Sequence, residues 1–149
     1  MELENEIASN KFEDNIHKSV VNVIYTYGWV TNLIRQHLDK YNITMQQFNI
    51  LRILRGQHPE PATVNLLKDR MLDKMSDASR IVERLVQKGL VSRCTNLKDR
   101  RAVDIKISPQ GLEILQKLDT EMITKDLIKG TLTDEEAGLL SSLLDKMRG

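Results

Sequence analysis

The sequence predicts a mainly helical chain that carries one small β-hairpin. Through most of its length, apolar residues recur at intervals of three and four, which is the period of an amphipathic helix. Only between residues 90 and 107 do short β-prone runs replace that pattern. Aromatic residues make up 4% of the 149 positions and hydrophobic residues 40%, which favours helix-on-helix packing. This length suits one domain, or one compact body with two lobes.

The amino-terminal third predicts one long helix. Residues 1–11 carry no periodic apolar pattern and are expected to fray. The apolar positions that follow are Ile16, Val20, Val23, Tyr27, Val30, Ile34, Leu38 and Tyr41. A helix of this length has more apolar face than a small lobe can cover, so part of it is expected to meet a second subunit.

Two shorter helices are predicted next. Thr44 and Gln47 form a capping-box pattern that opens a helix through Leu51 and Leu54, which is expected to end before Gly56. Thr63 then caps a short helix that carries Val64, Leu67 and Met71. Residues 72–75 are expected to form a turn.

The stretch from Ser76 to Gly111 predicts a helix, a turn and a hairpin. Ala78, Ile81, Val82 and Leu85 share one helix face, and Gly89 ends the helix at about Lys88. The hairpin strands carry Leu90, Val91, Val103, Ile105 and Ile107. Asn96, Lys98, Asp99, Arg100 and Arg101 are expected to project from its tip. Ser108 and Pro109 then open another helix. This order is that of a winged helix-turn-helix.

Two helices are predicted to complete the chain. The first carries Leu112, Leu115, Leu118, Met122, Ile123 and Leu127 and is ended by Gly130. A capping box at Thr133 and Glu136 opens the second, which carries Leu139, Leu140, Leu143, Leu144 and Met147. We therefore divide the chain into an amino-terminal helix region (1–42), a winged helix-turn-helix domain (43–108) and carboxy-terminal helices (109–149). We expect the two outer regions to dimerise and the middle one to be a DNA-binding domain, for the reasons given below.

Positive charge is concentrated in the winged half. The whole chain has a formal net charge of +1, but residues 68–106 hold 11 Lys and Arg against 6 Asp and Glu, a net of +5, and the remainder carries −4. Such an asymmetry is typical of a protein with one face that meets phosphate. A merely solvated face is the alternative.

The sequence lacks the residues that are characteristic of several other classes of protein. No apolar run is long enough to span a bilayer, and the acidic amino terminus does not read as a signal peptide, so we expect a cytoplasmic protein. Cys94 is the single cysteine, and the histidines have no partners at ligand spacing, so no metal or other cofactor is predicted. A redox role of Cys94 is kept as a hypothesis. Without a nucleophile–base pair or a phosphate loop, we predict no enzymatic activity.

The winged stretch resembles the MarR family of bacterial transcription regulators. The resemblance rests on Arg84-Leu85, Lys88-Gly89-Leu90-Val91, Arg93, Asp99-Arg100-Arg101, and Ile107-Ser108 with Gly111, and it extends from about Ile16 to Met147. It implies a homodimeric regulator, expected to be a repressor, that binds a palindromic operator in double-stranded DNA. Lys68 departs from the alanine that many members carry.

Candidate DNA contacts follow from helix geometry. The first turns of a recognition helix lie nearest the base edges, and Ser76, Asp77, Ser79 and Arg80 occupy them. Arg80 is the candidate for base reading, because a guanidinium pairs bidentately with guanine. Ser79 contacts a base or a phosphate, whereas Asp77 accepts from cytosine, caps the helix or orients Arg80. Arg84 reaches phosphate or pairs with Glu83.

The resemblance also implies roles for the wing and for a ligand. Arg100 and Arg101 serve the minor groove or its flanking phosphates, Asp99 braces the loop and Lys98 contacts phosphate. In a dimer the two recognition helices lie about 34 Å apart. A small aromatic or phenolic effector would bind between the lobes, near Tyr25, Tyr27, Trp29, His37 and Phe48, unless these residues pack at the dimer interface. Two alternatives stay open: a helical dimer that acts through protein partners, and a DNA binder without effector control.

Overall fold

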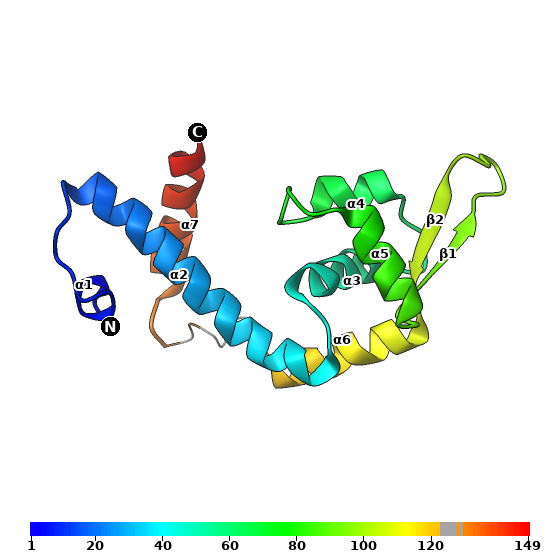
Figure 1. The fold of residues 1–149 in the computed structure, drawn as a ribbon, viewed down its shortest axis with the longest axis horizontal. Coiled ribbons are helices and arrows are strands. Elements are labelled where there is room, and N and C mark those ends of the chain that lie inside the picture. The colour runs from blue at the N-terminus through cyan, green and yellow to red at the C-terminus, as the bar shows by residue number, and fades with distance from the viewer. Residues whose placement is uncertain (123–127, 129) are drawn as a thin grey trace.

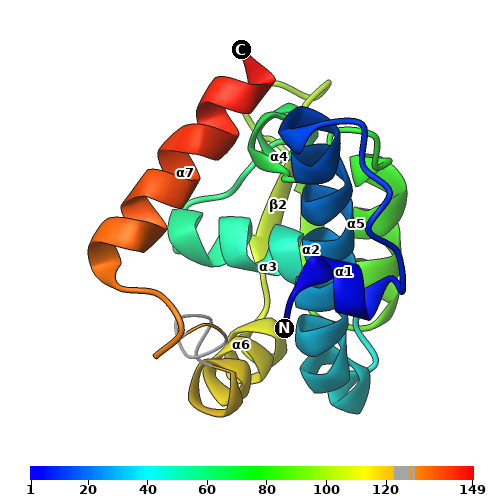
Figure 2. The ribbon, with the colours of Figure 1, turned by 90° about the vertical axis from the view of Figure 1, so that its left-hand side faces the viewer.

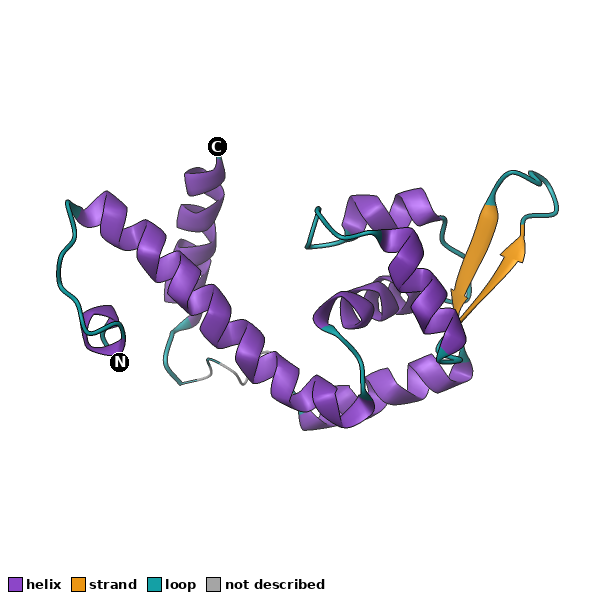
Figure 3. Cartoon of the chain, viewed as in Figure 1, coloured by secondary structure: helices purple, strands orange, loops and turns teal. Residues whose placement is uncertain are grey.

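The computed structural model describes residues 1–122, 128 and 130–149, and these form an arm and a body (Figure 1). The arm consists of two helices, α2 (Asn15–Leu38) and α7 (Asp134–Arg148), which overlap in Figure 1 but lie apart from each other in Figure 2. The body holds α3 (Met45–Gln57), α4 (Val64–Arg70), α5 (Ala78–Gln87), β1 (Val91–Thr95) and β2 (Val103–Ile107). Between them lie the 3-10 turn η1 (Asp39–Tyr41) and α6 (Pro109–Glu121), and α1 (Leu3–Glu6) begins the chain. Figure 3 shows the predicted fold class, helices with a single hairpin.

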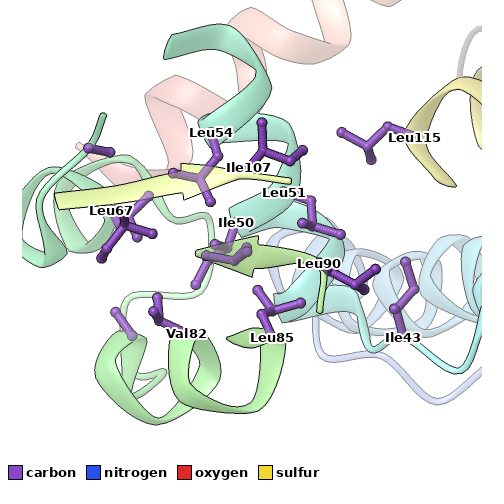
Figure 4. Packing of buried hydrophobic residues seen from close by; sticks show 14 of the residues in the cluster. Ile43, Ile50, Leu51, Leu54, Leu67, Val82, Leu85, Leu90, Ile107 and Leu115 are labelled. Atoms are coloured by element: carbon purple, nitrogen blue, oxygen red, sulfur yellow. The ribbon is translucent and has the colours of Figure 1, made fainter. Parts of the chain in front are cut away.

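The hydrophobic core lies in the body. Leu51 of α3, Leu85 of α5 and Ile105 of β2 are fully buried, and Leu115 joins them from α6. Figure 4 shows these elements meeting around Ile50, Leu67 and Leu90. The core therefore fixes α5 and the hairpin against one common support, α3 and α6.

The hairpin is joined to the body by a pairing that the sequence analysis missed. β1 and β2 are antiparallel, in a register that runs from Val91 opposite Ile107 to Thr95 opposite Val103. Ala62, which lies just before α4, forms two further backbone hydrogen bonds with Ile105, of 2.8 and 2.9 Å. Ala62 thus extends the edge of the hairpin at β2 and ties it to the loop before α4.

The arm leaves apolar surface uncovered. Figures 1 and 2 show α2 and α7 extending from the body without lying against it along their length. Within α2, Ile16 is 74% exposed and Tyr27 71%, and no residue of α7 is buried. The outer part of α2 is therefore available to a partner, as its apolar pattern predicts.

The four predicted helix caps are confirmed, with capping boxes at Thr44 and Thr133 and side-chain caps from Thr63 and Ser108. Three details differ. Residues 3–6 do not fray but form α1, because Leu3 is buried and the side chains of Glu4 and Glu6 bond to Lys18 and Tyr25 of α2. Helix α3 runs through Gly56 to Gln57. Helix α6 ends at Glu121, so Met122 is its C-cap and not a helical residue as expected, and the expected positions Ile123 and Leu127 lie outside the described residues.

Candidate nucleic-acid interface

Helix α5 begins at Ala78, two residues later than the sequence analysis places it. Asp77 is its N-cap, and its carboxylate accepts a hydrogen bond of 3.2 Å from the backbone N–H of Arg80. Ser76 precedes the helix, and its hydroxyl donates to Asp73 over 2.7 Å. Of the three roles open to Asp77, capping is therefore the one seen. Ser76 and Asp77 hold the entrance to the helix in place.

Asp73 organises the turn that leads into α5. Its carboxylate accepts from the Ser76 hydroxyl and from the backbone N–H of Met75, the latter over 3.0 Å. These hydrogen bonds, with that of Ser76 the larger cause, lower the pKa of Asp73 below its ordinary value. The turn before the recognition helix is thus built around a carboxylate that the sequence analysis did not single out.

The outer face of α5 carries the predicted contact residues. Ala78, Val82 and Leu85 are buried, whereas Ser79, Arg80 and Arg84 are exposed. The ion pair considered between Glu83 and Arg84 is not formed in the described structure. A cavity of about 340 Å³ runs beside this face, lined by Thr44, Gln46, Gln47, Ser76, Asp77, Arg80, Ile81 and Arg84. The start of α3 therefore borders the same surface as the start of α5.

The wing tip is closed by two polar side chains. The side-chain oxygen of Asn96 accepts from the backbone N–H groups of Lys98 and Asp99, over 2.8 and 3.0 Å. Asp99 in turn accepts from the backbone N–H of Arg101 over 3.0 Å, as expected of a bracing residue. Asn96 is half-buried and also donates to Asp104 over 3.0 Å, so it does not project from the tip as we expected. Lys98, Arg100 and Arg101 are exposed.

The base of the wing is fixed to the end of α5 and the start of α6. Gly89 adopts a φ of +71°, the left-handed conformation expected where a helix ends. The hydroxyl of Ser108 donates to the carbonyl of Gly89 over 2.7 Å and accepts from the backbone N–H of Gly111 over 3.1 Å. One serine therefore links the recognition helix, the wing and α6.

Lys88 forms a contact that sequence reasoning did not anticipate. Its ammonium donates to the backbone carbonyl of Asn42 and, over 3.1 Å, to the side-chain oxygen of Gln47. The sequence analysis treated Lys88 only as a cation in the last turn of a helix. No local pattern signals acceptors more than forty residues away.

A second cavity, of about 400 Å³, lies where the arm joins the body. It is lined by Tyr27, Thr31, Arg35, Asp39, Asn42, Ile43, Thr44, Met45, Gln46 and Lys88. Of the residues near which we expected an effector, only Tyr27 lines it. Arg35 and Lys88 bring two cations to its wall, against the one carboxylate of Asp39.

The other expected effector residues, Tyr25, Trp29, His37 and Phe48, line neither of these two cavities. The hydroxyl of Tyr25 donates to Glu6 of α1 over 2.8 Å. Phe48 lies under the guanidinium of Arg52, 5.7 Å from the ring centre. Trp29 and His37 are half-buried on α2, and the Nδ1 atom of His37 is buried without a hydrogen-bond partner in the described residues. Neither of the two cavities gathers these four side chains, and their role in effector binding stays a prediction.

Other site types find little support in the described chain. Residues 1–122, 128 and 130–149 contain no group of three or more His, Cys, Asp or Glu that could hold a metal ion. None of the helices described is long and apolar enough to cross a membrane. Cys94 is exposed on β1, opposite Asp104.

Comparison with known proteins gives a consistent result. The MarR family model matches residues 43–103. The multiple antibiotic resistance protein MarR of Escherichia coli (strain K12) is 30% identical over 118 residues, which cover 77% of this chain and 80% of that protein. The crystal structure of a mutant of Escherichia coli MarR complexed with operator DNA is 27% identical, covers 99% of both chains and superposes with a TM-score of 0.71.

A further solved structure is that of the organohalide-sensing transcriptional regulator RdhR in its 2,4-dichlorophenol-bound form. It is 26% identical, with a TM-score of 0.78 and coverage of 93% of this chain and 83% of that one. The two-strand wing, the capped recognition helix and these matches lead to one conclusion. The chain belongs to the MarR family of transcription regulators and has the winged-helix DNA-binding fold of that family.

Proposed function

We propose that this regulator binds a palindromic operator in double-stranded DNA as a homodimer and represses transcription from it in the bacterial cytoplasm. One observation carries the proposal. Every ion pair that the described residues form, including Lys40 with Glu121 and Arg55 with Asp119, lies outside residues 68–106. Residues 68–106, which hold a net +5, thus keep their cations out of ion pairs, as a surface built for phosphate would.

Arg80 is the proposed base-reading residue of α5. It is exposed in the first turn, beside the cleft at the start of α3, and its guanidinium can pair bidentately with O6 and N7 of guanine. Arg84 lies one turn further along the same face and reaches phosphate. Ser79 contacts a base or a phosphate. Ser76 and Asp77 support the interface by fixing where the helix begins.

The wing is proposed to enter the minor groove. A narrow minor groove concentrates negative potential and attracts arginine, and Arg100 and Arg101 stand exposed at a braced tip. Asp99 acts by bracing the loop. Lys98 contacts phosphate, which positions the protein without reading sequence.

A second copy of the chain is the proposed partner of the arm. The exposed apolar residues of α7 are Leu139, Leu140, Leu143 and Met147, which are 46–61% exposed. An amphipathic helix with no buried residue gains its stability from a partner that covers its apolar face. Residues 1–42 and 109–149 would then dimerise, while residues 43–108 bind DNA.

The cavity between arm and body is the proposed effector site. Tyr27 supplies an aromatic wall, and Arg35 and Lys88 favour a ligand that carries negative charge. A small aromatic or phenolic molecule in an anionic form, such as a phenolate, combines these properties. The dichlorophenol in the RdhR structure is a ligand of this kind. Because the cavity lies at the junction, a bound ligand would act on the angle between arm and body and thereby release DNA.

The test is fluorescence anisotropy with duplex DNA from upstream of the regulator's own gene, titrated across salt concentration. We expect tight binding that falls steeply with salt and survives excess random DNA. Arg80→Ala should weaken binding by about 1–3 kcal/mol and relax sequence preference. Lys117→Ala is the matched control, since it removes one positive charge from α6, where Lys117 pairs with Glu113. If random DNA competes as well as the operator for the protein, the result would instead favour the alternative that the chain acts through a protein partner.

Two further measurements test the remaining parts of the proposal. Sedimentation should give a dimer at micromolar concentration, and a monomer would refute the assignment of the arm. Adding 2,4-dichlorophenol to the operator complex should release DNA from the wild type and less from Arg35→Ala. A complex that neither 2,4-dichlorophenol nor another small phenol releases would indicate a DNA binder without effector control.

A further inference from the structure

We propose that Lys88 is a positioning residue for operator recognition, which sets the angle of the recognition helix relative to the dimerisation arm. Lys88 is the C-cap of α5, and its backbone N–H donates to the carbonyl of Arg84 over 3.1 Å. Its side chain continues beyond the helix to the junction of arm and body. One residue therefore belongs to the recognition helix by its backbone and to the junction by its ammonium.

The first acceptor at the junction is the carbonyl of Asn42. Asn42 is the C-cap of η1 and adopts the left-handed conformation, with φ of 52° and ψ of 44°. This residue is the point at which the chain leaves the arm, because η1 directly continues α2. A hydrogen bond to a backbone carbonyl here holds the end of the arm itself, and the bond does not depend on a side chain at position 42.

The second acceptor is the amide oxygen of Gln47 in the first turn of α3. Gln47 is 3% exposed and is the one buried polar residue in the described core. Its oxygen also accepts from the backbone N–H of Thr44 over 3.1 Å, which is half of the α3 capping box. Buried polar groups need their partners, so this oxygen fixes the direction from which Lys88 approaches.

Together these bonds connect three elements that meet nowhere else through side-chain polar contacts in the described chain: the arm, the start of α3 and the end of α5. In a dimer the arms determine how far apart the two recognition helices lie. Operator half-sites one DNA turn apart require that distance to be held. We infer that Lys88 transmits the geometry of the arm to α5 and so selects the spacing of the half-sites.

Two simpler roles must be distinguished from this one. A cation in the last turn stabilises any helix through its dipole, without affecting which operator is bound. A lysine near DNA can also contact phosphate directly, which adds affinity and salt dependence for every sequence. The positioning role alone predicts an effect on spacing at an unchanged salt slope.

The experiment compares the full-length wild type with Lys88→Met, which keeps the length of the side chain and removes its charge and donors. Two duplexes are used: the operator segment that the wild type protects, and the same segment with its half-sites moved apart by one base pair. We expect Lys88→Met to bind the natural operator about tenfold more weakly. It should discriminate between the two duplexes less than the wild type does, and the salt slope should not change. Lys88→Arg should restore both properties, because it keeps the charge and the donors.

Wild-type affinity and spacing preference in Lys88→Met would overturn the proposal. A salt slope lowered by about 0.9 would overturn it as well, since this is the signature of one lost phosphate contact. If Lys88→Met does not fold by circular dichroism, Lys88→Gln gives the same test, because its neutral amide is too short to span the junction. The inference rests on the proposed function. If the wild type binds no operator, that function is refuted. If the wild type binds the operator and Lys88→Met binds it equally well, only the role of Lys88 is refuted.

Discussion

Replacing Gly111 by alanine should displace the base of the wing. Gly111 is buried in the first turn of α6, where a Cβ atom would lie 2.4 Å from the carbonyl oxygen of Leu90 and 2.8 Å from Cγ1 of Ile107. Leu90 precedes β1, and Ile107 ends β2. The oxygen belongs to the backbone, so the clash cannot be relieved by rotating a side chain. Helix α6 and the wing must move apart.

The magnitude follows from two opposing effects. Overpacking of a well-packed site costs about 1–3 kcal/mol, and alanine in a helix is favoured over glycine by up to about 1 kcal/mol. We therefore expect Gly111→Ala to lower the free energy of unfolding by about 1–2 kcal/mol. At about 2–4 °C per kcal/mol for a chain of this size, Tm should fall by about 5 °C. Operator affinity should fall too, because the wing carries Arg100 and Arg101.

The matched control is Gly56→Ala. Gly56 also lies in a helix, but its added Cβ would meet nothing within 4 Å, so only the helix preference remains and Tm should rise slightly. Both variants are compared with the wild type by thermal circular dichroism at one protein concentration, since a dimer's Tm depends on concentration. A Gly111→Ala protein at least as stable as Gly56→Ala would show that the base of the wing yields freely, and the reasoning would fail.

Three further outcomes are expected. Ser108→Ala removes a helix cap and the bond to Gly89, so denaturant unfolding should show a loss of about 1–2 kcal/mol, and a loss below 0.5 kcal/mol would contradict this. Asp77→Ala should cost about 1 kcal/mol while operator affinity falls, whereas Asp77→Ser keeps a cap and should recover most of the stability. The pKa of Glu121 is lowered, first by the hydrogen bond from Tyr41 and then by Lys40. The ionised Glu121 therefore stabilises the fold above the ordinary carboxyl pKa, and this stabilisation is lost as the pH falls through the lowered pKa of Glu121. The Tm of Glu121→Gln should therefore change less than that of the wild type between pH 7 and 3, and parallel curves would exclude this contribution.

Local features of the fold were predictable, because their causes lie within a few residues. A cap such as Thr44 satisfies the backbone N–H of Gln47, three positions along the chain, and a window of that size contains the whole interaction. The same holds for Gly89, where the chain must turn out of a helix. The end of α5 and the position of the hairpin followed from such windows, whereas the start of α5 was placed two residues too early. The exposure of Arg80 and Arg84 followed from the apolar period of the opposite face.

The contacts that could not be predicted join distant parts of the chain. Ala62 pairs with Ile105 through backbone atoms, which no side-chain pattern encodes. Helix α1 forms because its carboxylates reach Lys18 and Tyr25 of α2, although the segment has no apolar period of its own. Of the residues expected around an effector, only Tyr27 lines the cavity at the junction, and the role of the others stays a prediction. These residues were expected from their place on the first helix and around Phe48, whereas the cavity is shaped by where α2 meets the start of α3.

The local contacts and the contacts between distant segments together show which charged residues stabilise the fold and which remain for DNA. Around the recognition helix and the wing, structural contacts are made by neutral groups or by carboxylates that accept from the backbone: Asp77 at the helix entrance, Asn96 and Asp99 at the wing tip, and Ser108, just beyond residues 68–106, at the base of the wing. Among the cations of residues 68–106, Arg70 donates to Gln57, and Lys74 donates to the backbone carbonyls of Lys68 and Asp69. Lys88 is the cation that holds the junction, and it does so through neutral oxygens. The arginines of α5 and the wing are therefore not needed to hold the fold. Variants at Arg80 or Arg101 should lose operator affinity at nearly unchanged stability, whereas variants at Lys88 or Ser108 should lose affinity through geometry.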